Sequence, residues 1–211
     1  MEKEQILTSL KAAREGEKRK FVQTFELAVN LTNLNLKKGE GKFSEDVQLP
    51  HGKGRPVQIG IFADGELAEK LKKQNVPTFS KADITDFQTK KRDARKIARK
   101  YDFLLAQTDL MVLIGKTIGQ ILGPKGKMPK PLPPQGDPAA LLARLQKSVR
   151  VRIKDDPVIH VPVGTEAMTD EQVADNILAV MKTVMLKLPK GLDNLGPVYL
   201  KTTMGKAVRI Q

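Results

Sequence analysis

The 211-residue sequence predicts two fold types in one chain, an α+β domain built from both ends and an α/β domain built from the middle. Near both ends, apolar and polar residues alternate with a period of two, which is typical of half-buried strands. In the middle, short apolar runs alternate with helical segments, which favours parallel strands. Insertion of one domain into another would explain this order. We therefore expect one domain at residues 1–53 and 150–211 and the inserted one at residues 54–149.

The beginning of the terminal domain predicts a helix and then a strand. The apolar residues of segment 4–14 fall near one helical face. Beyond it, Phe25 and Leu27 alternate with Thr24 and Glu26, so the polar pair should face outward. The next expected elements are a strand at residues 46–49 and a hinge rich in glycine and proline at residues 50–56.

The inserted domain should contain strands and helices in alternation. Its first expected elements are a strand at 57–63, helices at 66–74 and 90–101, and a strand at 103–106. Thr108 should cap the next helix, which ends at Leu122, and a surface loop follows at 123–136. Asp137 and Pro138 should begin the last helix, which runs through Lys147.

The last third of the chain returns to the period of two. Segments 149–154 and 158–164 predict a hairpin across the turn at Asp155 and Asp156. Thr169 to Gln172 matches a capping box at the start of a long helix. Residues 198–210 are strand-like with Gly205 inside, where we expect a bulge or a close backbone approach.

The charge of the chain indicates a polyanionic partner. Thirty-seven Lys and Arg against 24 Asp and Glu give a net charge of +13 and a pI of about 9.8. No apolar stretch is long enough to span a membrane, and the first ten residues lack the apolar core of a signal peptide, so we expect a cytoplasmic protein with no membrane partner. Nucleic acid is the first candidate for this partner. Aromatic residues make up only 4%, so an RNA partner, if the partner is RNA, should be mostly structured.

The residues for metal, thiol or cofactor chemistry are scarce. There is no cysteine, and neither His51 nor His160 has a metal-binding spacing, so we expect no metal and no cofactor. Gly115, Lys116 and Thr117 resemble the end of a phosphate-binding loop. The glycine that this loop needs five positions earlier is absent, and the segment predicts a helix interior. We therefore predict that the protein is not an enzyme. A nucleotide-dependent enzyme that uses the inserted domain remains the alternative.

A second alternative is a nucleic-acid chaperone held by charge alone. The helix at residues 90–101 and the following glycine-proline loop supply an auxiliary basic surface for sequence-independent phosphate contact. Its residues are Lys91, Arg92, Arg95, Lys96, Arg99, Lys125 and Lys127.

Six segments that carry a family resemblance are spread over nearly the whole chain, namely FVQTFELAVNL from Phe21, LPHG from Leu49, ILGPKGKMPKP from Ile121, IHVPVG from Ile159, VADNI from Val173 and YLKTTMGKAVRI from Tyr199. With these segments the sequence resembles the L-one family of large-subunit ribosomal proteins, and its archaeal branch looks closest.

This resemblance implies a Rossmann-like inserted domain that two hinge strands join to an α+β domain. It also implies binding to the large-subunit rRNA at the mobile stalk by the tRNA exit site. There the stalk helps deacylated tRNA to leave. It further implies repression of the protein's own mRNA and a monomer off the ribosome.

The resemblance also implies which residues contact RNA. These are Lys20, Phe21, Thr24, Glu26, His160, Gly164, Thr203, Met204 and Gly205. Phe21 shares the parity of the core residues, so alternation alone would bury it. Ala167 stands where some relatives carry an RNA-contacting serine, so that contact cannot form here.

Overall fold

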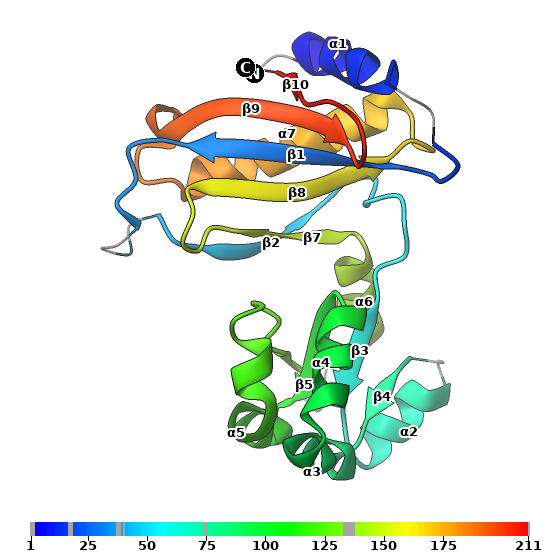
Figure 1. Ribbon diagram of the computed structural model, residues 1–211. Helices are drawn as coiled ribbons and strands as arrows, with labels where there is room; N and C mark the ends of the chain where they lie inside the picture. The colour runs from blue at the N-terminus through cyan, green and yellow to red at the C-terminus, as the bar shows by residue number, and fades with distance from the viewer. Residues whose placement is uncertain are drawn as a thin grey trace. The chain divides into compact units, whose positions relative to one another are not determined.

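A computed structural model describes residues 3–16, 19–36, 39, 41–73, 76–132 and 138–210. The chain divides into two compact units, Met1–Pro56 with Lys147–Gln211 and Val57–Gln146 (Figure 1). The first mixes helices with antiparallel strands and the second has parallel strands, so the predicted fold class is confirmed. Among the described helices, none is long and apolar enough to cross a membrane.

The first unit is built on a four-stranded antiparallel sheet in the order β10-β9-β1-β8. A separate antiparallel pair joins β2 to β7. The elements of this unit are α1 (Lys3–Arg14), β1 (Thr24–Leu31), β2 (Ser44–Gln48), β7 (Ser148–Arg152), β8 (Val158–Thr165), α7 (Asp170–Lys187), η3 (Gly191–Asn194), β9 (Leu195–Thr202) and β10 (Val208–Arg209).

Strand β1 shows how the sequence determines the two faces of this sheet. Its residues alternate between half-exposed and buried along the whole strand. Phe25 and Leu27 are fully buried in a core that also contains apolar residues of α1 and α7. Thr24 and Glu26 lie on the opposite face, as the alternation predicted.

Helix α7 begins at the predicted capping box, in which the Thr169 side chain accepts from the Gln172 N–H and the Gln172 side chain accepts from the Thr169 N–H. On its buried face, the Asn176 amide donates to the carbonyl oxygens of Gly52 (2.7 Å) and Val163 (2.8 Å). Its oxygen accepts from the His51 N–H at 3.2 Å. This buried amide therefore attaches the hinge segment to the first unit.

Two predictions about the strands of this unit were wrong. Strand β7 does not form a hairpin with β8; it pairs with β2, and β8 pairs with β1. The last strand is interrupted after Thr202, and the chain turns so that β10 pairs back onto β9. Alternation predicts that a segment is a strand, but it does not identify the partner strand.

The second unit is a parallel sheet in the order β4-β3-β5-β6, with helices on both faces. One core joins the sheet to α3, α4 and α5, and another joins it to α2 and α6. The elements are β3 (Ile59–Phe62), α2 (Glu66–Lys73), β4 (Thr78–Phe79), α3 (Lys81–Thr89), α4 (Lys91–Lys100), β5 (Phe103–Gln107), η2 (Thr108–Leu110), α5 (Met111–Leu122), β6 (Lys130–Leu132) and α6 (Pro138–Gln146).

Several boundaries of the second unit differ from the prediction. Thr108 is not a helix cap: a 3₁₀ turn precedes α5, and the Thr108 hydroxyl donates to the Leu132 carbonyl at 3.5 Å. The glycine-proline segment contains β6, an edge strand of the sheet, and edge strands tolerate proline. Strand β4 and helix α3 were not predicted. Residues 133–137, and with them the predicted Asp137 cap, lie outside the described residues.

Candidate nucleic-acid interface

Four of the predicted contact residues line one hollow of about 390 Å³ on the first unit. They come from three separate places in the sequence, namely the start of β1, the middle of β8 and the segment after β9. The lining residues are Thr24, Glu26, Arg55, His160, Val161, Pro162 and Thr203. The tertiary fold thus gathers polar groups that are up to 179 positions apart in the sequence.

Glu26 sits beside an irregularity of the sheet. The register of β1 against β8 shifts between Phe25, opposite Gly164, and Glu26, opposite Pro162. Such a bulge locally bends a strand and redirects its side chains. Within the described residues, the side chains of Glu26, Arg55 and His160 have no hydrogen-bond or ion-pair contact. These groups therefore remain available to a ligand.

Thr203 and Thr24 contact each other directly. The Thr203 hydroxyl accepts from the Thr24 N–H at 3.1 Å and donates to the Thr24 carbonyl at 3.3 Å. A hydroxyl has one hydrogen to donate and two lone pairs. Thr203 can therefore only accept from a ligand, and its first role is to fasten the segment after β9 to the start of β1.

A buried glutamine that the sequence analysis did not single out organises the same end of the sheet. Gln23 is 3% exposed, and its amide donates to a Glu166 carboxylate oxygen at 3.0 Å. The other Glu166 oxygen accepts from the Gln23 N–H at 2.9 Å. The Gln23 side-chain oxygen accepts from the Met204 N–H at 3.0 Å. Since Gln23 shares the parity of Phe25, a buried polar side chain that needs partners could have been inferred.

Arg14, at the end of α1, binds the loop between β8 and α7. Its guanidinium donates to Asp170 (2.6 Å) and to the carbonyls of Glu166 (2.8 Å) and Met168 (2.6 Å). It also lies 5.0 Å from the ring centroid of Phe25. Arg14 therefore holds the backbone of Glu166 in place, and with it the carboxylate that binds Gln23.

Large apolar side chains are exposed close to this network in the sequence. Phe21 is 52% exposed, because the alternation of β1 extends back only to Gln23, and Phe21 and Val22 before it are both exposed. Met204 is 61% exposed. A second hollow of about 550 Å³ includes Lys20 and Phe21 together with Arg19 and Glu166. Exposed apolar surface beside cations suits contact with a nucleotide.

The two predicted glycines have packing reasons for being glycine. Gly164 is buried, and a Cβ there would lie 2.9 Å from Val173 Cγ2, so we remove it from the proposed contacts. Gly205 lies in the turn between β9 and β10, where a Cβ would overlap the Thr202 hydroxyl. It stays in the proposed set because it is half-buried and directly follows Met204.

The predicted basic surface of the second unit is centred on one face of α4. Its members Arg92, Arg95, Lys96 and Arg99 line a hollow of about 370 Å³. Ala94 and Ala98 are buried, so the helix attaches through small residues and presents its long cations to solvent. Lys91 and Lys125 are exposed, whereas the Lys127 ammonium donates to the Tyr101 carbonyl at 2.6 Å and belongs to the fold.

Lys96 differs from its neighbours because it is already paired. Its ammonium donates to Asp93 at 2.9 Å, and this hydrogen bond lowers the pKa of Asp93 below its ordinary value. Arg92, Arg95 and Arg99 have no such contact among the described residues. The three arginines are therefore the stronger candidates for phosphate contact.

Within the described residues, no group of three or more His, Asp or Glu side chains could hold a metal ion. The side chains of the candidate interface are instead hydroxyl, carboxylate, guanidinium, imidazole and thioether groups. Such groups exchange hydrogen bonds and apolar contacts with riboses and bases.

Comparison with known proteins identifies the family of this chain. The chain is similar to proteins named large ribosomal subunit protein uL1. That of Pyrococcus horikoshii is 42% identical over 212 aligned positions, which cover 100% of this chain and 97% of the relative. That of Methanothermobacter thermautotrophicus is 42% identical over 98% of this chain and 99% of its own length. The model of the ribosomal protein L1p/L10e family matches residues 10–206, and the chain belongs to this family.

Proposed function

We propose that this protein is a structural component of the large ribosomal subunit that binds rRNA through the hollow of the first unit. The observation that carries the proposal is that Thr24, Glu26, His160 and Thr203 line one hollow although they come from distant parts of the sequence. Hydroxyl, carboxylate and imidazole groups can pair with base edges and with 2′-hydroxyls, and the 2′-hydroxyls distinguish RNA from DNA.

The second unit adds attraction that does not depend on sequence. Its arginines on α4 form a concentrated cationic face. Contacts of this kind release counterions from the RNA and weaken as salt rises. We assign selectivity to the first unit and attraction to the second.

The place of binding that we propose is the mobile stalk near the tRNA exit site, where the protein assists the release of deacylated tRNA. Repression of the protein's own mRNA follows if that mRNA forms a similar fold. These finer assignments rest on the family, whose members named above are proteins of the large subunit. On this proposal the protein works on the ribosome, in the cytoplasm.

Competition between a stalk rRNA fragment and duplex DNA at moderate salt tests the proposal. We expect the rRNA fragment to remain bound when duplex DNA is in excess, because DNA offers phosphates without 2′-hydroxyls. A matched fragment with 2′-deoxyriboses at the contacted positions should bind more weakly. Equal binding of the two ligands would instead indicate a general chaperone held by charge.

The enzyme alternative has lost its main sequence support. Gly115 lies inside α5, where the backbone N–H groups are used within the helix. The family to which the chain belongs is one of structural ribosomal proteins and not of enzymes. Incubation with ATP or GTP should therefore leave the nucleotide intact, and hydrolysis of the nucleotide by the protein would contradict the proposal.

A further inference from the structure

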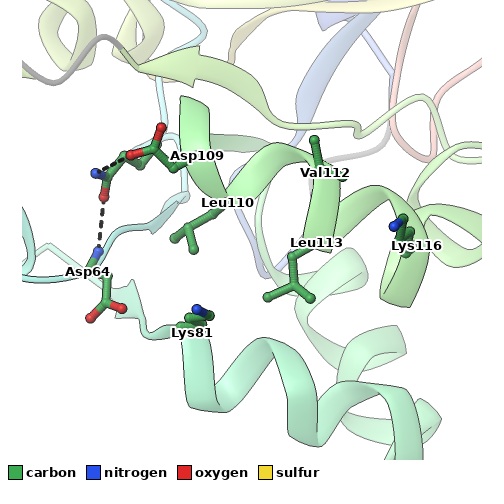
Figure 2. A pocket seen from close by; sticks show the side chains of 8 residues that line it. Asp64, Lys81, Asp109, Leu110, Val112, Leu113 and Lys116 are labelled. Carbon is green, nitrogen blue, oxygen red and sulfur yellow. Dashed lines mark hydrogen bonds between the residues drawn. The ribbon is translucent and has the colours of Figure 1, made fainter.

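A pocket of about 450 Å³ lies at the carboxyl ends of β3 and β5 in the second unit (Figure 2). The chain leaves β3 toward β4 on one side and leaves β5 toward β6 on the other, so the strand order reverses between them. In open parallel sheets, ligands bind in the crevice at this point. The basic face of α4 shares no residue with this pocket.

The polar end of the pocket is pre-organised by one glutamine. Gln107 accepts from the Asp64 N–H at 3.2 Å and donates to Asp109 Oδ2 at 3.3 Å. Asp64 Oδ1 accepts from the N–H of Gly65 at 3.0 Å. Within the described part of the chain, Asp64 Oδ2 and Asp109 Oδ1 keep their capacity to accept from a ligand.

The opposite end of the pocket is cationic. Asp109, Val112, Leu113 and Lys116 follow one face of η2 and α5, so carboxylate, apolar wall and ammonium succeed one another along the pocket. Lys81, at the start of α3, lines the pocket on the side of Asp64 (Figure 2). For neither ammonium group does the described structure show a hydrogen bond or an ion pair.

We propose that this pocket binds a ribose phosphate unit. The carboxylates accept hydrogen bonds from the sugar hydroxyls, as an acidic residue does for ribose in related α/β sheets. Lys116 binds the phosphate as a point charge, while Lys81 offsets the carboxylate charge on the Asp64 side of the pocket. Leu113 and Val112 contact the face of the sugar or base. Two aspartates balance two lysines, so a bare phosphate gains little and the hydroxyls are needed for binding.

The ribose phosphate can come from a free nucleotide or from one nucleotide of an RNA strand. Titration of the isotope-labelled full-length protein with ribose 5-phosphate, and separately with a short single-stranded RNA, distinguishes these sources by NMR. The reporters are the backbone amides of Asp64 and Gly65 and the side-chain amide of Gln107. We expect saturable shifts of these signals with at least one of the two ligands.

Matched ligands and variants decide the outcome. Ribose and inorganic phosphate should each bind at least tenfold more weakly than ribose 5-phosphate. Lys116→Ala should weaken binding at least fivefold, whereas Lys70→Ala, an exposed lysine of α2, should change nothing. Absence of shifts with both ligands, equal binding of inorganic phosphate, or unchanged binding by Lys116→Ala would overturn the proposal. Because these signals all belong to the second unit, failure here leaves the rRNA proposal for the first unit unaffected.

Discussion

The hollow of the first unit and the cationic face of α4 would offer a nucleic acid different side-chain groups, which also come from different parts of the sequence. The hollow combines a few mostly uncharged groups from β1, β8 and the segment after β9, and Gln23 and Thr203 fasten these segments by hydrogen bonds. The α4 face places four cations on ten consecutive residues of a single helix. Fixed groups can select a shape, whereas long exposed cations supply attraction that salt screens.

Met204→Asp should have the largest effect on rRNA binding. Met204 is 61% exposed, so the change costs little core packing, but it places a carboxylate against the RNA. We expect a loss of at least ~1–3 kcal/mol, which is roughly 5- to 150-fold in Kd, with little change in the salt slope. Leu192→Asp is the matched control, since Leu192 is 64% exposed on η3. Equal losses in both variants would contradict the RNA contact given to Met204.

Thr203→Ala should come next, at about 1–3 kcal/mol of RNA binding. The change also removes the two hydrogen bonds to Thr24, so the melting temperature should fall slightly as well. Thr203→Ser keeps the hydroxyl and should recover most of the affinity in the same filter-binding assay. If the serine variant binds as poorly as the alanine variant, the hydroxyl is not the group that matters.

Arg95→Ala should weaken binding modestly and reduce the salt dependence. Each lost phosphate contact lowers the slope of log affinity against log salt by about 0.7–0.9. Lys96→Ala should give a smaller effect in both quantities, because its ammonium is already shared with Asp93. Kd measured over a series of salt concentrations tests both variants. If Arg95→Ala left the salt slope unchanged and lowered the rRNA affinity as much as Thr203→Ala, the two regions would not have the different roles assigned to them.

Asp175→Asn should give the smallest effect, and on stability alone. Lys3 donates to the Asp175 carboxylate at 2.6 Å and lowers its pKa, and His51 lies 3.5 Å from the other oxygen. A carboxyl with a lowered folded pKa stabilises the fold above its ordinary pKa, and this contribution is lost as the pH falls through the folded value. The difference in melting temperature between variant and wild type should therefore shrink at acidic pH. A change in rRNA affinity at neutral pH would contradict a purely structural role.

Much of the candidate site was predictable only in pieces. The alternation along β1 correctly placed Thr24 and Glu26 on the face opposite Phe25, and the family resemblance pointed to Thr203 and Met204. Arg55 and Gln23 were missed: the first looked like a hinge residue, and the buried role of the second depends on Glu166 and Met204. Such long-range partners leave no local pattern in the sequence.

The sequence by itself determined the local features of this protein: the alternation of β1, the capping box of α7 and the cations along α4. Each depends on residues within a few positions of one another, so the chemistry of the segment suffices. The tertiary structure alone decided that β7 pairs with β2, that Gly164 is buried beside Val173, and that Thr203 meets Thr24. These outcomes depend on which distant segments pack together, and burial of the whole core selects that arrangement.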